Sequence, residues 1–277
     1  MSVPAQAGAR ERLAEVVPDA IAALHEVLER HTVTEEEWYA VLRFLTEVGR
    51  QDEFVLLSDV TRTSVLIDAM THGGDDSGAT ASDVEGPLYR DDPPWRERPV
   101  KIYEDYEGMG DGDVLFVRGR VTSTDGTLLR DAVVDVWQTG PDGGYDLWDP
   151  RQPAYNFRGR FRVDESGAYE FQTMVPKPYT VPTDGPVGRY LEAIGQHPWR
   201  PAHIHFKVTA DGHAPLVTQV FFPDDPYLED DTIGAVKSAL VRPLAKHDDD
   251  GEIAGRGLDR PFFTCDFDVV LRPQAKA

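Results

Sequence analysis

Apolar residues in the first 75 positions of the chain recur at intervals of three and four, the spacing of one face of an α-helix. The clearest run has as its apolar positions Val17, Ile21, Leu24, Val27 and Leu28. A second run follows a capping signal, in which Thr34 precedes Glu37 by three residues. A third run covers residues 52–70. We therefore predict that residues 1–75 are helical.

The pattern changes to short strands after residues 71–83, a stretch of glycine and small polar residues that predicts a loop. Three segments each hold two β-prone runs around an Asp-Gly or Ser-Gly pair, which is typical of hairpins; they cover residues 113–139, 159–176 and 200–223. Residues 261–273 alternate as a final strand. Because no helical crossover separates these strands, we predict a mainly β fold, an antiparallel β-sandwich.

The change in pattern also predicts how the chain divides. Its 277 residues suffice for one large domain or two modest ones with a real core. We expect residues 1–80 to form a helical N-terminal segment and residues 81–277 to form the β-sandwich domain. Hydrophobic residues make up 40% of the chain and aromatic residues 10%, which favours a folded protein over disorder.

The composition narrows the class of partner. The net charge is −21, so the chain lacks the basic face that a nucleic-acid binder needs. No apolar run approaches 18 residues, so we expect no membrane insertion. The N-terminus lacks the apolar core of a secretory signal, and the single cysteine, Cys265, can form no internal disulfide. Together these features favour a cytoplasmic protein.

Candidate chemistry begins with two histidines in one predicted strand. His203 and His205 lie two positions apart, and alternate residues of a strand point to the same face. Two imidazoles on one face form half of a metal site, although two polar residues on a solvated face explain the pattern equally well. The chain has no His-Glu-x-x-His helix and no Cys-x-x-Cys pair, so this reasoning leaves the remaining ligands open.

Several separated motifs resolve this question by resemblance. They are VEGPLY at 84–89, VDVWQTGPDGGYDLWDP at 134–150, YNFRGRF at 155–161, PKPYTVPTDGPVG at 176–188 and HPWRPAHIHFKV at 197–208. In these motifs the chain resembles the intradiol ring-cleavage dioxygenases, a family of non-haem iron(III) enzymes, over nearly its whole length. The resemblance implies a β-sandwich catalytic domain that cleaves a catechol ring with dioxygen between two vicinal hydroxyls.

The same resemblance implies a set of iron ligands. By motif position, the ligands that would hold Fe(III) are Tyr145, Tyr179, His203 and His205. Tyr179 would be the ligand that leaves when substrate binds and takes up a proton. Arg200 falls on the family's active-site arginine, which stabilises developing negative charge, and Gln219 falls on its active-site glutamine. Hard iron(III) favours anionic oxygen ligands, and a bound cation holds a phenol deprotonated.

The family's ring pocket is implied at three places in the chain. Its members here would be Leu56, Asp59, Val84, Glu85, Gly86, Val181 and Pro182. Asp59 could accept a hydrogen bond from a third ring hydroxyl, which favours hydroxyquinol (benzene-1,2,4-triol) as substrate, with maleylacetate or 3-hydroxy-cis,cis-muconate as product. Glu85 looks more like the catechol 1,2-dioxygenases, so catechol or a substituted catechol is the alternative. Thr61 and Arg62 stand where either branch has leucine and glycine.

Two further alternatives belong to other classes. The chain could be a β-sandwich binding module without catalysis, although all four implied ligands are present. It could also be an extradiol-type iron(II) enzyme, which needs two histidines and one carboxylate. The helical segment matches the family's dimerisation element, so the resemblance implies a homodimer with a phospholipid in the apolar groove of the interface.

Overall fold

The structure is a computed structural model that describes residues 8–73 and 77–274. Four helices form the N-terminal region: α1 (Ala9–Arg30), α2 (Glu35–Arg50), α3 (Phe54–Val60) and α4 (Thr63–His72). The predicted helical region is therefore confirmed over the described residues. Its capping signal is a complete capping box, because the Thr34 hydroxyl accepts from the Glu37 N–H at 3.3 Å and the Glu37 carboxylate accepts from the Thr34 N–H at 2.7 Å.

The third predicted run is divided between two helices. Arg62 has a φ of +60°, which stops helical hydrogen bonding between α3 and α4. The chain divides into two compact units, with the boundary between Gln51 and Asp52. Helices α3 and α4 therefore belong to the unit that holds the sheets. The functional division at residue 80, which concerns dimerisation, stays a prediction.

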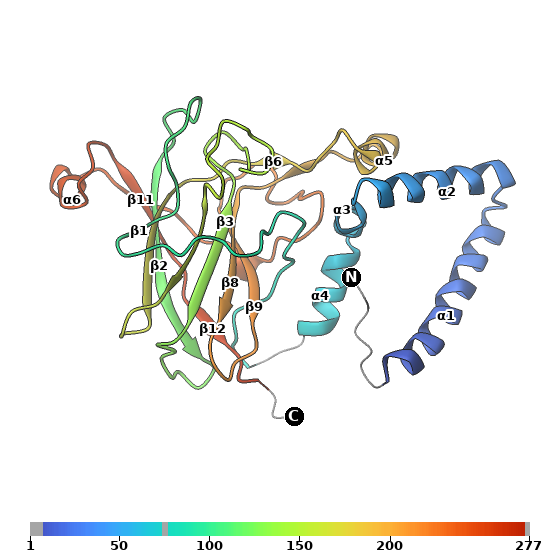
Figure 1. Cartoon of the computed structure of the whole chain (residues 1–277), viewed down its shortest axis with the longest axis horizontal. Coiled ribbons are helices and arrows are strands. Elements are labelled where there is room, and N and C mark those ends of the chain that lie inside the picture. Colours follow the sequence, from blue (N-terminus) through green and yellow to red (C-terminus); the bar gives the residue numbers. More distant parts are fainter. Residues whose placement is uncertain (1–7, 74–76, 275–277) are drawn as a thin grey trace. The chain divides into compact units, whose positions relative to one another are not determined.

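Twelve strands in the described residues form three sheets (Figure 1). The six-stranded sheet has the order β1 (Val100–Lys101), β5 (Ala168–Met174), β2 (Val114–Ser123), β11 (Phe262–Asp266) and β10 (Ala245–His247), and β12 (Val269–Leu271) also pairs with β2. The four-stranded sheet has the order β4 (Arg158–Arg162), β3 (Val133–Gln138), β8 (His203–Thr209) and β9 (Leu216–Phe221). A short pair consists of β6 (Tyr179–Thr180) and β7 (Trp199–Arg200). The predicted β-sandwich is confirmed.

One of the three predicted hairpins is correct. Strands β8 and β9 pair antiparallel around Asp211 and Gly212, whose φ is +71°. The other two are wrong, because β2 and β3 lie in different sheets, as do β4 and β5. The turn at Asp125 and Gly126 does reverse the chain, and the Ser123 N–H donates to the Thr127 carbonyl at 2.8 Å. A turn signal specifies a local reversal, whereas packing of the two sheets decides which partner a strand finds.

The predicted final strand is also divided. Phe267 and Asp268 separate β11 from β12, and both strands run parallel to β2, as β1 does to β5. At the break the Phe267 N–H donates to the Arg118 carbonyl at 2.8 Å and the Asp268 carboxylate accepts from the Arg120 N–H at 2.8 Å. A Cβ on Gly119 would overlap the Phe267 carbonyl, so this close approach requires glycine. The six-stranded sheet is therefore mixed.

Strand β8 separates the hydrophobic core from a second buried region. On one face, the Phe206 ring lies 6.0 Å from the ring centre of Phe171 and 5.1 Å from that of Phe267, between the sheets. The other face carries His203 and His205, which are also buried. Both faces of this strand are thus covered, which explains its nearly continuous burial.

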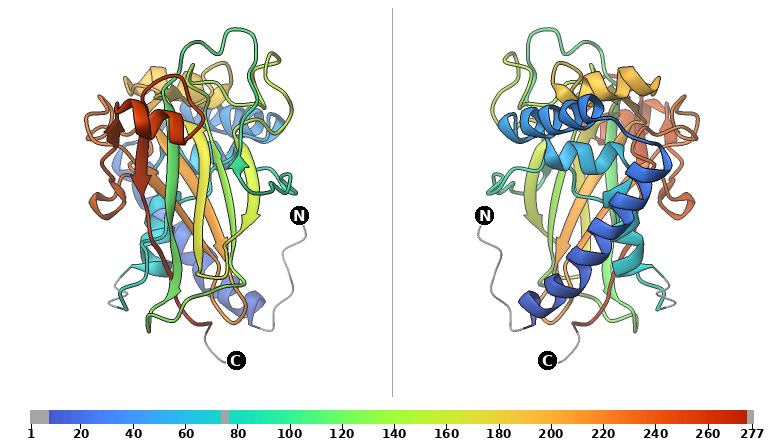
Figure 2. Two further views of the ribbon diagram at one scale, coloured as in Figure 1. Left: turned by 90° about the vertical axis from the view of Figure 1, so that its left-hand side faces the viewer. Right: turned by 90° about the vertical axis from the view of Figure 1, so that its right-hand side faces the viewer.

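Three short helices complete the fold: α5 (Pro186–Ile194), η1 (Ser238–Leu240) and α6 (Asp250–Gly255). Helices α3 and α5 pack against each other at one end of the sheets, whereas α6 lies beside β11 and β10 (Figures 1 and 2). Within residues 8–73 and 77–274, none of the helices combines the length and apolarity that a membrane span requires.

Candidate active site

Two imidazoles meet on the face of β8 that turns away from the core. The Nε2 atoms of His203 and His205 lie 3.1 Å apart, and both side chains are buried. The Nδ1 of His203 lies 2.7 Å from the Pro201 carbonyl oxygen. Because a carbonyl only accepts, Nδ1 carries the proton and Nε2 presents its lone pair. Burial lowers the pKa of both histidines well below the usual range, so both rings are neutral.

Two phenols from separate segments meet these imidazoles. Tyr145 follows a tight turn after β3, in which Gly143 has a φ of +84° and the Gly140 N–H donates to the Gly144 carbonyl. Tyr179 lies in β6. The ring centres of the two tyrosines are 5.3 Å apart, and the Tyr179 and His203 ring centres are 5.6 Å apart. The four residues that the resemblance implied as ligands are therefore brought together.

The phenol hydroxyls lie in an environment that favours their neutral form in the absence of a cation. Burial raises the pKa of Tyr145 well above its usual value. Burial also raises the pKa of Tyr179, although the charge of Arg200 opposes that shift. The Tyr145 hydroxyl has no hydrogen-bond partner among the described residues. An unpartnered buried hydroxyl is costly, and a cation held by this oxygen and its neighbours would offset the cost.

The donor set fits a hard cation rather than a soft one. Two neutral imidazoles and two phenols, which a cation would deprotonate, supply nitrogen and anionic oxygen without thiolate. In the described part of the chain, no group of three His, Cys, Asp or Glu side chains is placed to hold a metal. The extradiol alternative needs two histidines and a carboxylate, so these residues give it no support.

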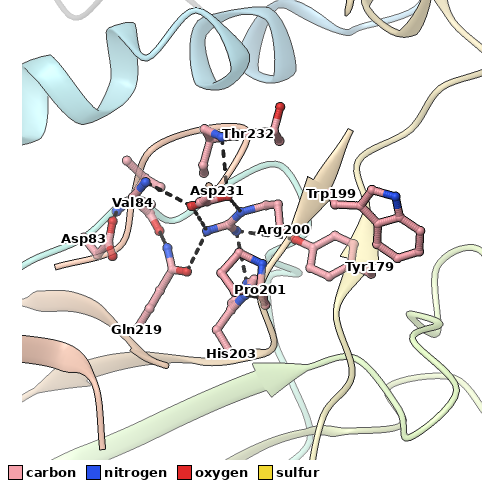
Figure 3. A network of polar contacts seen from close by, with 12 residues as sticks. Asp83, Val84, Tyr179, Trp199, Arg200, Pro201, His203, Gln219, Asp231 and Thr232 are labelled. Carbon is pink, nitrogen blue, oxygen red and sulfur yellow. Dashed lines mark hydrogen bonds and ion pairs between the residues drawn. The ribbon is translucent and has the colours of Figure 1, made fainter. Parts of the chain in front are cut away.

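A buried arginine connects this cluster to a network of polar groups (Figure 3). Arg200 pairs through Nε with the Asp231 carboxylate at 3.2 Å, and its Nη2 donates to the Gln219 carbonyl oxygen at 3.1 Å. Its Nη1 lies 3.1 Å from His203 Nε2 and 3.4 Å from the Tyr179 hydroxyl. Arg200 therefore makes a structural ion pair and faces the cluster at the same time.

The network places Gln219 and Val84 outside the cluster. The Gln219 amide donates to the Val84 carbonyl at 3.0 Å while its oxygen accepts from Arg200. A cavity lies beside the cluster, and neither Gln219 nor Val84 lines it. The resemblance placed Gln219 at the family's active-site glutamine, and in the structure its amide oxygen accepts from Arg200.

A cavity opens onto the cluster. Six of the seven implied pocket residues line it: Leu56, Asp59, Glu85, Gly86, Val181 and Pro182. Tyr179, Arg200 and His205 also line it. A second cavity, between α4, β9 and β12, shares no lining residue with this one.

Two carboxylates of this cavity differ in environment. Asp59 is buried, and burial raises its pKa, although Ser64 and Arg200 oppose the shift. The Glu85 carboxylate pairs with the Lys207 ammonium at 2.8 Å and is partly exposed. Glu85 therefore pairs with a cation near the surface, whereas Asp59 is the buried carboxylate that lines the cavity.

Comparisons with known proteins agree with this geometry. A family model described as "Dioxygenase" matches residues 84–273, and one described as "Catechol dioxygenase N terminus" matches residues 10–78. The chain belongs to the intradiol ring-cleavage dioxygenases. It is an intradiol dioxygenase enzyme, and the implied family is confirmed.

Relatives of this dioxygenase carry several substrate names. A hydroxyquinol 1,2-dioxygenase of Rhizobium sp. (strain MTP-10005) is 39% identical over 267 residues, covering 94% of this chain and 89% of that protein. A chlorocatechol 1,2-dioxygenase of Cupriavidus pinatubonensis is 37% identical over 233 residues, covering 84% and 89%. The solved catechol 1,2-dioxygenase of Acinetobacter radioresistens matches with a TM-score of 0.88 at 30% identity, covering 99% of this chain and 89% of that one.

Five residues of the site were not predicted from the sequence. Pro87 and Leu88 line the cavity from within VEGPLY, and Trp148 lines it three residues after Tyr145. All three lie within the family motifs at 84–89 and 134–150, so these motifs could have indicated them. Ile233, another lining residue, and Asp231, the partner of Arg200, lie in a loop that carries no motif.

The dioxygenase should depend on Asp231 for stability. We expect Asp231→Asn to lower the free energy of unfolding by about 3–5 kcal/mol, because it leaves the Arg200 charge buried and unpaired. Combining it with Arg200→Met should recover part of this loss. Urea unfolding measures both effects, and Asp266→Asn, which breaks the exposed pair with Arg118, should cost less than about 1 kcal/mol. A double variant as unstable as Asp231→Asn would contradict the assignment.

Proposed function

We propose that this dioxygenase binds Fe(III) through Tyr145, Tyr179, His203 and His205 and cleaves hydroxyquinol between its vicinal hydroxyls. The observation that carries the iron assignment is the convergence of two buried phenols on the two neutral imidazoles. Cleavage would give 3-hydroxy-cis,cis-muconate or its tautomer maleylacetate. Iron(III) bound there would bind the hydroxyl oxygens of the substrate and withdraw electron density from its ring. This withdrawal would make the ring reactive toward dioxygen.

Each protein group has a role that follows from its position. Tyr179 is the phenol within reach of Arg200, so its oxygen can accept a proton from a substrate hydroxyl while the guanidinium remains beside it. Arg200 is held by Asp231 and Gln219 and cannot turn away. Its fixed charge stabilises negative charge on the bound ring without reorganisation. The side chains of Leu56, Val181 and Ile233 give the cavity apolar walls.

Asp59 supports hydroxyquinol over catechol. Its buried carboxylate lines the cavity, where a third ring hydroxyl could donate to it. A site built to hydrogen-bond a hydroxyl loses affinity for the analogue that lacks it, because its own polar group is then left unpaired. The alternative substrate is catechol or a chlorocatechol, which the chlorocatechol 1,2-dioxygenase relatives favour.

The iron assignment predicts a coloured protein. Tyrosinate–iron(III) charge transfer should make the iron-loaded enzyme burgundy-red, and Tyr145→Phe should shift the visible band strongly. Tyr103→Phe, at a buried tyrosine outside the cluster, should leave the band unchanged. Visible absorption with metal analysis decides the matter. A colourless iron-loaded protein would sink the assignment and favour a binding module.

The substrate assignment predicts an order of rates. Hydroxyquinol should have the highest kcat/KM among hydroxyquinol, catechol, methylcatechols and chlorocatechols, measured as oxygen uptake. Asp59→Ala should lower kcat/KM for hydroxyquinol about 10- to 100-fold, since a hydrogen bond to a charged group contributes about 1.5–3 kcal/mol. The value for catechol should change little. A parallel fall for both substrates would mean that Asp59 has only a structural role.

We also propose that α1 mediates a homodimer and that a phospholipid occupies its apolar face. The exposed apolar residues of α1 are Leu13, Val16, Val17, Ile21, Leu24 and Val27. Their spacing forms one stripe along the helix, and a stripe of this length favours a partner that covers it. A second copy of the chain and an acyl chain both have the apolar chemistry that such a face binds.

The dimer proposal predicts a change of mass in solution. Leu24→Glu should convert a dimer into a monomer, because it places a charge within the stripe. Ala22→Glu adds the same charge on the polar face of α1, between Asp19 and Glu26, and should leave the dimer intact. Light scattering after gel filtration measures the mass, and lipid extraction tests for phospholipid. A wild-type protein with the mass of one chain would refute the proposal.

A further inference from the structure

A carboxylate at the start of α3 caps a different helix. The Glu53 Oε2 atom accepts from the Val187 N–H, in the first turn of α5, at 2.9 Å. Helix α5 has no side-chain cap from its own N-cap residue, Gly185. The first N–H groups of a helix lack partners within it and favour a negative charge. The cap of α5 therefore comes from α3, 134 residues earlier in the chain.

The backbone of α5 is shaped to receive this carboxylate. A Cβ on Gly185 would overlap the Glu53 carboxylate, so glycine permits the close approach. A Cβ on Gly188 would overlap the Thr183 backbone, so the turn that leads into α5 is equally tight. The contact therefore depends on particular residues: Glu53 supplies the acceptor, and Gly185 and Gly188 leave the space that the turn requires.

The two elements that Glu53 joins each adjoin a different part of the cavity wall. On α3, Leu56 and Asp59 follow Glu53 by about one and two turns, and both line the cavity. Val181 and Pro182 line it from the segment between β6 and α5. The Val181 N–H is tied to the Pro198 carbonyl at 2.9 Å on its other side. The Glu53 cap therefore connects the wall with the Asp59 carboxylate to the apolar wall.

We propose that Glu53 is a specificity-determining positioning residue that fixes the separation of these two walls. The proposal rests on the proposed function, because it concerns which ring fits between Asp59 and Val181. Glu53 does not line the cavity, so it acts through α3 and α5 and not by touching the substrate. A displaced wall weakens the hydrogen bond to a third ring hydroxyl and admits bulkier rings, since small shifts in positioning have large effects on rate.

The kinetic test compares Glu53→Ala with wild-type enzyme loaded with iron. We expect the ratio of kcat/KM for hydroxyquinol to that for catechol to fall about tenfold, mainly through KM for hydroxyquinol, with the visible band unchanged. Glu53→Gln keeps an acceptor for the Val187 N–H and should restore most of the ratio. A ratio that stays at the wild-type value in Glu53→Ala would overturn the proposal.

A matched control separates positioning from ordinary stabilisation. Asp249 caps α6, where its carboxylate accepts from the N–H groups of Gly251 and Glu252 at 2.9 and 3.1 Å. Asp249→Ala removes a carboxylate cap from a helix that lines no part of the cavity. It should lower Tm while leaving the substrate ratio unchanged. An equal change of ratio in Asp249→Ala and Glu53→Ala would overturn the proposal.

A second pair of variants tests the contact independently of catalysis. Gly185→Ala should displace the Glu53 carboxylate and reproduce the effect of Glu53→Ala. Alanine at position 53 leaves room for the Cβ of alanine at position 185. In the Glu53→Ala background, Gly185→Ala should therefore change the free energy of unfolding little further. Additive effects would overturn the proposed contact. A wild-type enzyme that converts no dihydroxybenzene or trihydroxybenzene would refute the proposed function instead, and the unfolding cycle would still decide the contact.

Discussion

The arrangement of the site depends on one buried ion pair, that of Arg200 with Asp231. Burial alone would lower the pKa of Arg200, but Asp231 and Tyr179 together outweigh it, and the net shift is upward. The guanidinium therefore stays charged while its remaining N–H groups reach Gln219, Tyr179 and His203. Without Asp231, a charge in this position would be too costly, since removing one partner of a buried pair leaves the other uncompensated. The ion pair thus makes the positive charge beside the phenols permanent.

That fixed charge acts on a cluster built from the four-stranded sheet and the short β6–β7 pair. Strand β8 presents its histidines on one face and Phe206 on the other, so the packing of the core also holds the imidazoles. Trp137 on β3 pairs with His205 across the strands, and their rings stack with centres 4.6 Å apart. The phenols arrive from Tyr145 after β3 and from Tyr179 in β6. Imidazoles on a strand and phenols on tight segments give a rigid donor set.

The cavity walls beyond Tyr179, Arg200 and His205, by contrast, come from helix and loop segments outside the sheets. Asp59 comes from α3, Gly86 from the segment before β1, Val181 from the segment after β6 and Ile233 from a loop after β9. Such walls can change without disturbing β8, which is consistent with one family holding relatives named for hydroxyquinol, chlorocatechol and catechol. The Glu53 cap is a contact between two such segments, and it would allow ring preference to be adjusted while the donor cluster stays constant.

The sequence by itself determined the features that repeat locally or carry a motif. Helical spacing, the capping box at Thr34 and the shared face of His203 and His205 follow from backbone geometry over a few residues. The family resemblance predicted which residues converge, including Tyr145 and six cavity residues. Only the tertiary structure decided the sheet to which β3 belongs, the role of Gln219 and the contacts made by Asp231 and Glu53. These depend on partners far along the chain, and hydrophobic periodicity records which face is buried but not what covers it.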